Sequence, residues 1–425
     1  MSFAIKFLLK NKALRYPQFR KFLILRFSLI LALNMQTAII GYFVYRNLTR
    51  DVLALGKLGL WEVIPAIGCS LFSGHFVDLR EKKGLMIQCI IGYLLLSAFY
   101  TVLSFPGFYN HAGTNLTVHL IYVGVFIGGI LRAFLSPSSF ALMSMLIPRK
   151  EYANATTWSS TAWQAGFVIG PILAGALIGI AGFEISLFSV FVIQIVSLIA
   201  IFTIPKQQIL KKEKEPVLKS LKQGLRFVFK TQLILAALSL DMFAVLFGGA
   251  VALLPVYAID ILKVGDFAYG CLRAAPGVGS IATLFILSFS PLKTKPGLKL
   301  LGCIAGFGLV TIVFGISKSF TLSLLMLVLG GMFDAVSVVI RGTILQLKTP
   351  DSMRGRVGAV NTMFISSSNE LGAAESGLTA KWMGTIPAVV FGGCMTLVVV
   401  GITYFAAPML RMLNLQEDTA AENKT

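Results

Sequence analysis

Charged side chains interrupt otherwise apolar stretches at a few positions, and these are the first candidates for chemistry. Arg132, Asp241, Asp334 and Glu370 each lie inside a long apolar run. A charge inside a lipid bilayer is costly unless it faces water or an opposite charge, so such residues usually bind a ligand, carry a proton or form an ion pair. Desolvation also favours the neutral form of a carboxylic acid, which suits proton uptake near neutral pH.

Residue patterns typical of enzymes are absent from the sequence. The five cysteines all lie in apolar runs without CxxC or metal-binding spacing, and the three histidines are scattered. The sequence contains no phosphate-binding loop and no evident nucleophile–histidine–carboxylate set. It therefore predicts no enzyme, no cofactor, no metal site and no ATP-driven step in this chain.

The composition is that of an integral membrane protein. Of the 425 residues, 56% are hydrophobic and only 13% are charged, whereas soluble domains carry about 25% charged residues. About 20 apolar residues suffice for a helix to cross the hydrocarbon core, and twelve segments reach that length. We predict an all-α protein with spans at 22–45, 53–77, 84–105, 117–147, 153–178, 184–204, 232–261, 267–290, 298–317, 320–347, 356–380 and 384–410.

The net charge of +19 reflects orientation in the membrane. Most Lys and Arg residues fall on one side of the predicted spans, and the basic side is the cytoplasmic one. We therefore expect both termini in the cytoplasm and no nucleic-acid partner. The predicted parts are a cytoplasmic segment at 1–21, a six-helix half at 22–204, a basic cytoplasmic linker at 205–230, a second half at 231–410 and a cytoplasmic tail at 411–425. The first of these is either a surface amphipathic helix or a plain tail.

An internal repeat relates the two halves. Gly59, Pro65 and Gly68 recur at the same spacing as Gly270, Pro276 and Gly279. The repeat makes Asp334 the counterpart of Arg132 and Arg273 the counterpart of Glu62. Parallel repeats of this kind occur in transporters whose halves move around a binding site.

A charged loop carries the first family resemblance. Its residues Gly74, Asp78, Lys82 and Lys83 resemble the loop between helices 2 and 3 of the major facilitator superfamily, although Leu79 and Glu81 depart from the family pattern. The resemblance implies two pseudo-symmetric six-helix halves and a loop that controls the conformational cycle. The alternative is a generic basic turn.

A glycine-rich stretch in the fifth span resembles a motif of the antiporters in this family. The matching residues, to which the resemblance gives a conformational role, are Gly166, Gly170, Pro171 and Gly175. Small residues let helices approach closely, and proline permits a kink. The motif implies export; the alternative is close packing without a role in coupling.

The resemblance also assigns the charges to sites. Spans 1, 4, 7 and 10 of the family line a central cavity, so one substrate pocket would hold Arg132, Asp334, Asp241, Asn34 and Gln36. Arg132 and Asp334 would pair there, as a transport site or as a structural salt bridge. Proton coupling is expected at Asp241 and Glu370, then Asp334; for Glu370 the alternative is a packing hydrogen bond. Glu62 and Arg273 are expected to hold the halves together, and Arg26 to reach water at the inner edge.

Three further stretches suggest a branch of the family. The first two lie at 14–20 and 269–277, and the third combines 354–361 with 368–377. Together they resemble the bacterial exporter branch that includes the enterobactin exporter and macrolide efflux proteins. This implies a monomeric secondary active transporter in the bacterial inner membrane. It would export an amphiphilic, siderophore-like or drug-like molecule by proton antiport through alternating access. The alternatives are a proton-coupled importer, a lipid flippase, and a non-transporting sensor or assembly protein.

Overall fold

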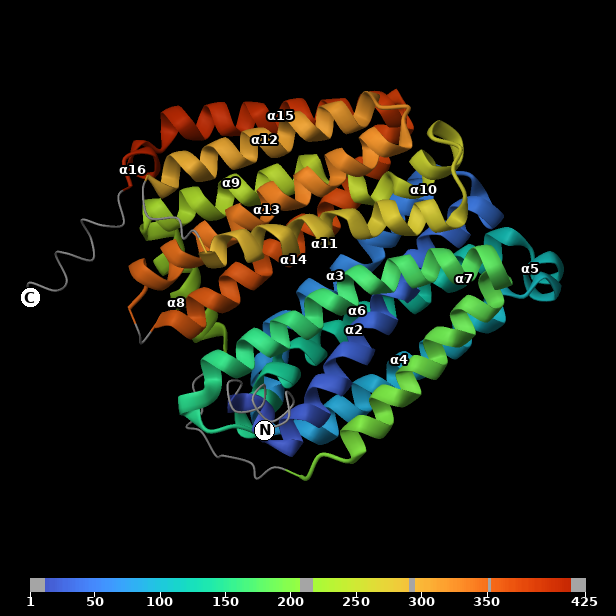
Figure 1. Cartoon of the computed structure of the whole chain (residues 1–425), viewed down its shortest axis with the longest axis horizontal. Coiled ribbons are helices and arrows are strands. Elements are labelled where there is room, and N and C mark those ends of the chain that lie inside the picture. Colours follow the sequence, from blue (N-terminus) through green and yellow to red (C-terminus); the bar gives the residue numbers. More distant parts are fainter. Residues whose placement is uncertain (1–11, 207–216, 290–294, 351–352, 414–425) are drawn as a thin grey trace, which may run out of the picture. The chain divides into compact units, whose positions relative to one another are not determined.

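The chain is helical throughout the part that the structure describes. A computed structural model describes residues 12–206, 217–289, 295–350 and 353–413, and no strand occurs in these ranges (Figure 1). The prediction of an all-α fold is confirmed. The long helices are α2 (Pro17–Phe43), α3 (Val52–Leu79), α4 (Lys82–Ser104), α6 (Thr114–Met145), α7 (Tyr152–Phe202), α8 (Val217–Lys230), α9 (Gln232–Gly248), α11 (Asp266–Phe289), α12 (Pro296–Ile316), α13 (Phe320–Lys348), α14 (Arg354–Met383) and α15 (Thr385–Ala406).

Short elements connect or extend these helices. The π-helical turns η2 and η5 lengthen the first and seventh spans, and η4 and α10 join α9 to η5. The short elements are η1 (Lys12–Arg15), η2 (Val44–Thr49), α5 (Pro106–Ala112), η3 (Arg149–Glu151), η4 (Ala250–Leu253), α10 (Leu254–Val256), η5 (Tyr257–Ile261) and α16 (Pro408–Arg411).

The observed helices account for the twelve predicted spans. Ten stretches of the described residues are long and apolar enough to cross a membrane. One of these, within α7, covers two predicted spans, which meet at Gly182, where a non-helical φ of 78° and ψ of −179° kink the chain between two helices. Glycine adopts a positive φ at no steric cost. The twelfth span is α14, which has the length but is more polar than the others.

Three helix ends differ from the predicted boundaries. The first span begins at Pro17 instead of 22, because proline is well suited to the first helical position. The charged break predicted at 74–84 is shorter, since α3 continues to Leu79 and α4 begins at Lys82. The predicted linker at 205–230 ends in the helix α8, while residues 207–216 lie outside the described part.

The chain forms two compact units, which we describe separately. The first comprises Met1–Arg50, Trp61–Val217 and Gly265–Ala274. In it α2 packs along α7, and α4 contacts both α6 and α7. Gly166 and Gly170 make the first contact close, because a Cβ on Gly166 would lie 2.9 Å from the Leu31 nitrogen. The helices are thus closely packed at the glycine motif, and its conformational role stays a prediction.

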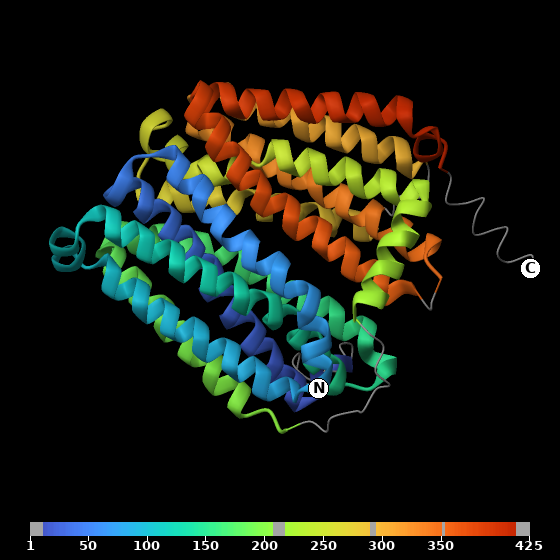
Figure 2. The same ribbon diagram turned by 180° about the vertical axis from the view of Figure 1, so that it is seen from behind.

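The second unit comprises Asp51–Leu60, Leu218–Val264 and Ala275–Thr425. Its α12 packs against α13 and α15, and α9 packs against α14 and α15; Figures 1 and 2 show these helices side by side from opposite directions. The core is built from fully buried aliphatic side chains of several helices, including Ile234, Ala237, Leu300 and Ile344. Burial of such side chains contributes about 1.5–3 kcal/mol each.

Each unit contains a short segment from the opposite half of the chain. In the second unit the start of α3 crosses α14, where a Cβ on Gly56 would lie 2.9 Å from the Gly377 Cα. In the first unit the start of α11 crosses α7, where a Cβ on Gly175 would lie 2.9 Å from the Gly270 Cα. Both crossings are therefore backbone against backbone.

Candidate functional site

A buried ion pair forms the centre of the candidate site. Asp241 on α9 and Arg341 on α13 approach to 2.7 Å between a carboxylate oxygen and a guanidinium nitrogen, and their side chains are only 6% and 5% exposed. The Nε atom of Arg341 also donates a hydrogen bond of 3.3 Å to the hydroxyl of Ser337, one turn earlier on α13. Two charges this deeply buried are stable only as partners.

A second carboxylate completes the cluster. Asp334 lies on the same face of α13 as Arg341, two turns away, and its charge interacts with Arg341 and Asp241. The three side chains therefore combine two acids with one base, so the fully ionised cluster carries one negative charge. Binding a single proton makes it neutral, which is the chemistry that a proton-coupled carrier needs.

The depth of this cluster follows from helix geometry. Asp241 is nine residues after the start of α9 and Arg341 is seven residues before the end of α13. With a rise of 1.5 Å per residue, both lie roughly 10–14 Å inside the spans, measured from the end where α9 begins. The cluster is therefore within the membrane and not at its surface.

Arg132 has a partner that the sequence analysis did not assign to it. Its guanidinium is 2.5 Å from the carboxylate of Glu62 on α3. The Arg132 side chain is 53% exposed and that of Glu62 is 24% exposed. Both belong to the first unit, whereas Asp334 belongs to the second, so the predicted Arg132–Asp334 pair stays a prediction. The ion pair that the structure describes for Glu62, with Arg132, joins two helices of the same half of the chain.

Arg26 also differs from the expectation that it reaches water. Its Nε donates to the backbone oxygen of Ser159 at 3.1 Å, and its Nη1 donates to the hydroxyl of Ser139 at 2.9 Å. The side chain thus joins α2, α6 and α7 inside the first unit. The prediction of a snorkelling arginine was wrong, because two protein acceptors satisfy the guanidinium at this depth.

Two polar residues of the first span behave differently. The side-chain amide of Asn34 donates to the Ile30 backbone oxygen of its own helix at 2.9 Å. Gln36 is 8% exposed, and its Oε1 has no hydrogen-bond partner among the described residues. A buried acceptor without a donor is costly, so Gln36 is the stronger candidate of the two for binding a substrate.

A polar cluster lies at the far end of the first span. Asp266, at the start of α11, accepts hydrogen bonds from the hydroxyl of Tyr42 at 2.9 Å and from the guanidinium of Arg46. Tyr42 stacks on Tyr269 with ring centroids 4.2 Å apart. Arg273, which was expected to join the halves, lies beside Tyr269 in this first unit.

The charged loop is held by lysine and by an unexpected cap. Lys83 is 8% exposed and donates to the backbone oxygens of Phe202 at 3.2 Å and of Ile204, at the end of α7. Lys82 donates to the backbone oxygens of Val77 and Arg80 in the preceding turn. Glu81, a departure from the family pattern, is the N-cap of α4 and accepts the Gly84 N–H at 2.9 Å. The side chain of Asp78 is outside the described part, although its helix is defined.

The remaining proton-coupling candidate lies at a helix crossing. Glu370 is half-buried on α14, and its backbone oxygen would lie 2.9 Å from a Cβ placed on Gly59 of α3. The position of this residue therefore supports a packing role as well as a proton-coupling one, and the two remain alternatives.

These features define a class of protein. Twelve membrane-spanning helices, an internal repeat, and charges paired within the spans are characteristic of secondary transporters. A sequence model of the Major Facilitator Superfamily matches residues 22–373. The chain belongs to this superfamily, and it is an integral membrane transporter.

Similar proteins agree with this assignment. The enterobactin exporter EntS of Citrobacter koseri is 24% identical over 396 residues, which cover 91% of each chain. The fold is similar to that of a bacterial homologue of the human lysosomal transporter Spinster, with a TM-score of 0.66, 16% identity and coverage of 93% of this chain and 96% of that one. It is also similar to a D-xylose–proton symporter, with a TM-score of 0.69, 15% identity and coverage of 94% and 100%.

Proposed function

We propose that this protein exports an amphiphilic small molecule in exchange for protons, by alternating access. The observation that carries the proposal is the buried cluster of Asp241, Asp334 and Arg341. A carrier gains nothing in stability from two buried acids on one base, since apolar side chains would be at least as favourable there. A cluster that changes from charged to neutral when it binds one proton can instead bias the two conformations of the carrier.

The proposed exchange uses this change of charge. When the cluster is ionised, its spare negative charge favours proton uptake on the side where protons are abundant. When it is protonated, the neutral cluster removes the penalty of moving a net charge through the low-dielectric membrane. Glu370 is a second proposed proton carrier, because it is half-buried on the polar helix α14.

The substrate and the direction come from the relatives and from the glycine motif. EntS is an enterobactin exporter, so a siderophore is the first class of substrate to test, followed by drug-like amphiphiles. The similarity to bacterial exporters supports placement in the inner membrane with cytoplasmic termini. We further propose that the protein acts as a monomer. The proposed substrate contacts come from Arg132, Asn34, Gln36, Asp241 and Asp334. The proposed control of the conformational cycle comes from the charged loop and the glycine motif, with the residues Gly74, Asp78, Lys82, Lys83, Gly166, Gly170, Pro171 and Gly175.

Everted membrane vesicles test the proposal directly. With a proton gradient imposed, vesicles that contain the protein should accumulate enterobactin, a macrolide or another member of a compound panel, and they should release protons in return. Collapse of the gradient by nigericin should stop accumulation. Accumulation that continues undiminished without any ion gradient would exclude proton antiport.

Matched acid-to-amide variants test the cluster. D241N and D334N should each lower proton-driven accumulation by at least about tenfold, the range expected for loss of an essential proton-transfer group. D260N is the control, because Asp260 is an exposed carboxylate on η5 at the other end of the same span. Equal losses in D260N and D241N would show that the effect does not come from the cluster.

A further inference from the structure

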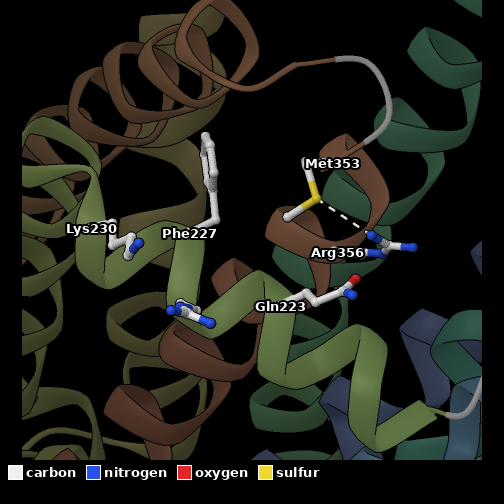
Figure 3. Close-up of a pocket in the computed structure, with 6 residues that line it drawn as sticks. Gln223, Phe227, Lys230, Met353 and Arg356 are labelled. Atoms are coloured by element: carbon white, nitrogen blue, oxygen red, sulfur yellow. Dashed lines mark hydrogen bonds between the residues drawn. The ribbon is translucent and has the colours of Figure 1, made fainter.

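A basic pocket lies where α8 meets the start of α14. It has a volume of about 330 Å³ and is lined by Gln223, Arg226, Phe227, Lys230, Met353 and Arg356. Figure 3 shows Met353, the N-cap residue of α14, beside Arg356 on α14, with Gln223 and Phe227 on the neighbouring helix α8. All of these residues belong to the second unit. The mechanism of transport proposed above does not use this pocket.

The charges of the pocket have one sign. Arg226 and Lys230 are one helical turn apart on α8, and Arg356 on α14 also lines the pocket. Among the described residues that line the pocket there is no carboxylate, and Phe227 and Met353 supply its apolar surface. Three cations and an apolar wall around one opening are complementary to a phosphate group attached to an apolar body.

The packing of α8 fixes this arrangement. Gly224 lies against the backbone of Arg356, because a Cβ there would be 2.8 Å from the Arg356 oxygen. Val228 is fully buried in the core of the unit. With 3.6 residues per turn, Arg226 and Lys230 lie on the side of α8 away from Gly224 and Val228, so they form the exposed edge of the pocket.

The pocket lies at the level of the lipid head groups. Lys230 is two residues before the span that begins at Gln232, and Arg356 is two residues after the start of α14. The N-terminal end of the thirty-residue helix α14 adds a partial positive charge at this level. Phe229, next to Lys230, is 59% exposed, which is favourable where the side chain can enter lipid.

We propose that this pocket binds the phosphodiester of an anionic phospholipid, as a bound lipid that holds α8 against the membrane. A free phosphate ion offers the same charge, but it would leave Phe229 and the apolar wall in water. The lipid places its phosphate among Arg226, Lys230 and Arg356 and its acyl chains beside Phe229. The helix α8 and the pocket then form one membrane-docking element.

Native mass spectrometry of the purified full-length protein tests the proposal. Dioleoylphosphatidylglycerol and dioleoylphosphatidylcholine are titrated separately into the protein in a neutral detergent. A basic residue near the head groups contributes about fivefold to binding of an anionic lipid, so R226Q/K230Q should weaken phosphatidylglycerol binding about 25-fold. Binding of the zwitterionic phosphatidylcholine should change little.

A matched control separates the pocket from general charge. K150Q/K222Q removes two exposed lysines that do not line the pocket, and its binding should stay within about threefold of the unmodified protein. Equal weakening in both double variants would overturn the proposal. Displacement of the lipid by an excess of inorganic phosphate would also overturn it, because the site would then belong to a soluble anion. If R226Q/K230Q does not fold, the single variants R226Q and K230Q should each show about a fivefold loss.

Discussion

Removal of Arg341 should destabilise the protein more than removal of either acid of its cluster. Arg341→Met leaves Asp241 and Asp334 as two buried acids without a base, whereas Asp241→Asn leaves Arg341 with Asp334. The pair of Asp241 and Arg341 is 2.7 Å apart and almost fully buried. At an effective dielectric constant of about 20 the gross attraction at this distance is roughly 6 kcal/mol.

The net cost is smaller, because desolvation opposes the attraction. Breaking a buried pair by removing one partner costs about 3–5 kcal/mol, and R341M should fall in this range. D241N should cost about 1–2 kcal/mol, since a hydrogen bond is lost while the charge of Arg341 remains compensated. R341M/D241N should be more stable than R341M, because it leaves one acid uncompensated instead of two.

Unfolding by titration with SDS in mixed micelles provides the free energies. The control is R149M, since Arg149 is an exposed arginine in η3, and it should stay within about 0.5 kcal/mol of the unmodified protein. The deficit of R341M should also shrink as the pH is lowered, because protonation removes the uncompensated charges. If R341M is no less stable than D241N, the three side chains do not form a charged cluster and the reasoning is refuted.

Two further predictions concern the first unit and its loop. R132Q and E62Q should each lower transport and cost about 1 kcal/mol of stability, a modest value because the Arg132 side chain is 53% exposed. A double-mutant cycle should show coupling between the two substitutions. Coupling of R132Q to D334N instead would contradict this assignment. D78N should slow turnover while leaving substrate affinity unchanged, since the loop motif is expected to act on the conformational cycle. Transport rates give the turnover, and equilibrium binding gives the affinity. A loss of affinity with normal turnover would contradict that role.

The spans could be predicted because membrane crossing leaves a strong one-dimensional signal. Long apolar runs identified all twelve helices, and the charged breaks located most of their ends. The break between the fifth and sixth spans, predicted between residues 178 and 184, contains Gly182, where the chain passes from one helix to the next. The start of α4 was missed because Glu81 acts there as an N-cap, a role that depends on local geometry.

The partners of the buried charges could be predicted only in part. The repeat relates Arg132 to Asp334 as equivalent positions in two halves, and equivalence gives no information about contact. Arg341 is also a charge within a span, but the sequence analysis gave it no role, although its spacing of seven residues from Asp334 places both on one face of α13. The contact of Arg341 with Asp241 depends on the packing of α9 against α13, which no sequence spacing specifies.

The polarity of α14 has a consequence for how the protein is made. This helix is long enough to span the bilayer, yet it carries arginines near its start, Glu370 and Glu375 in its second half and Lys381 near its end. Charged residues oppose insertion of a helix from the translocon into lipid. The helix therefore has to enter the membrane against protein, with α9 already synthesised and α15 still to follow as its neighbours. A nascent chain that ends after α14 lacks α15, one of the helices against which α14 packs.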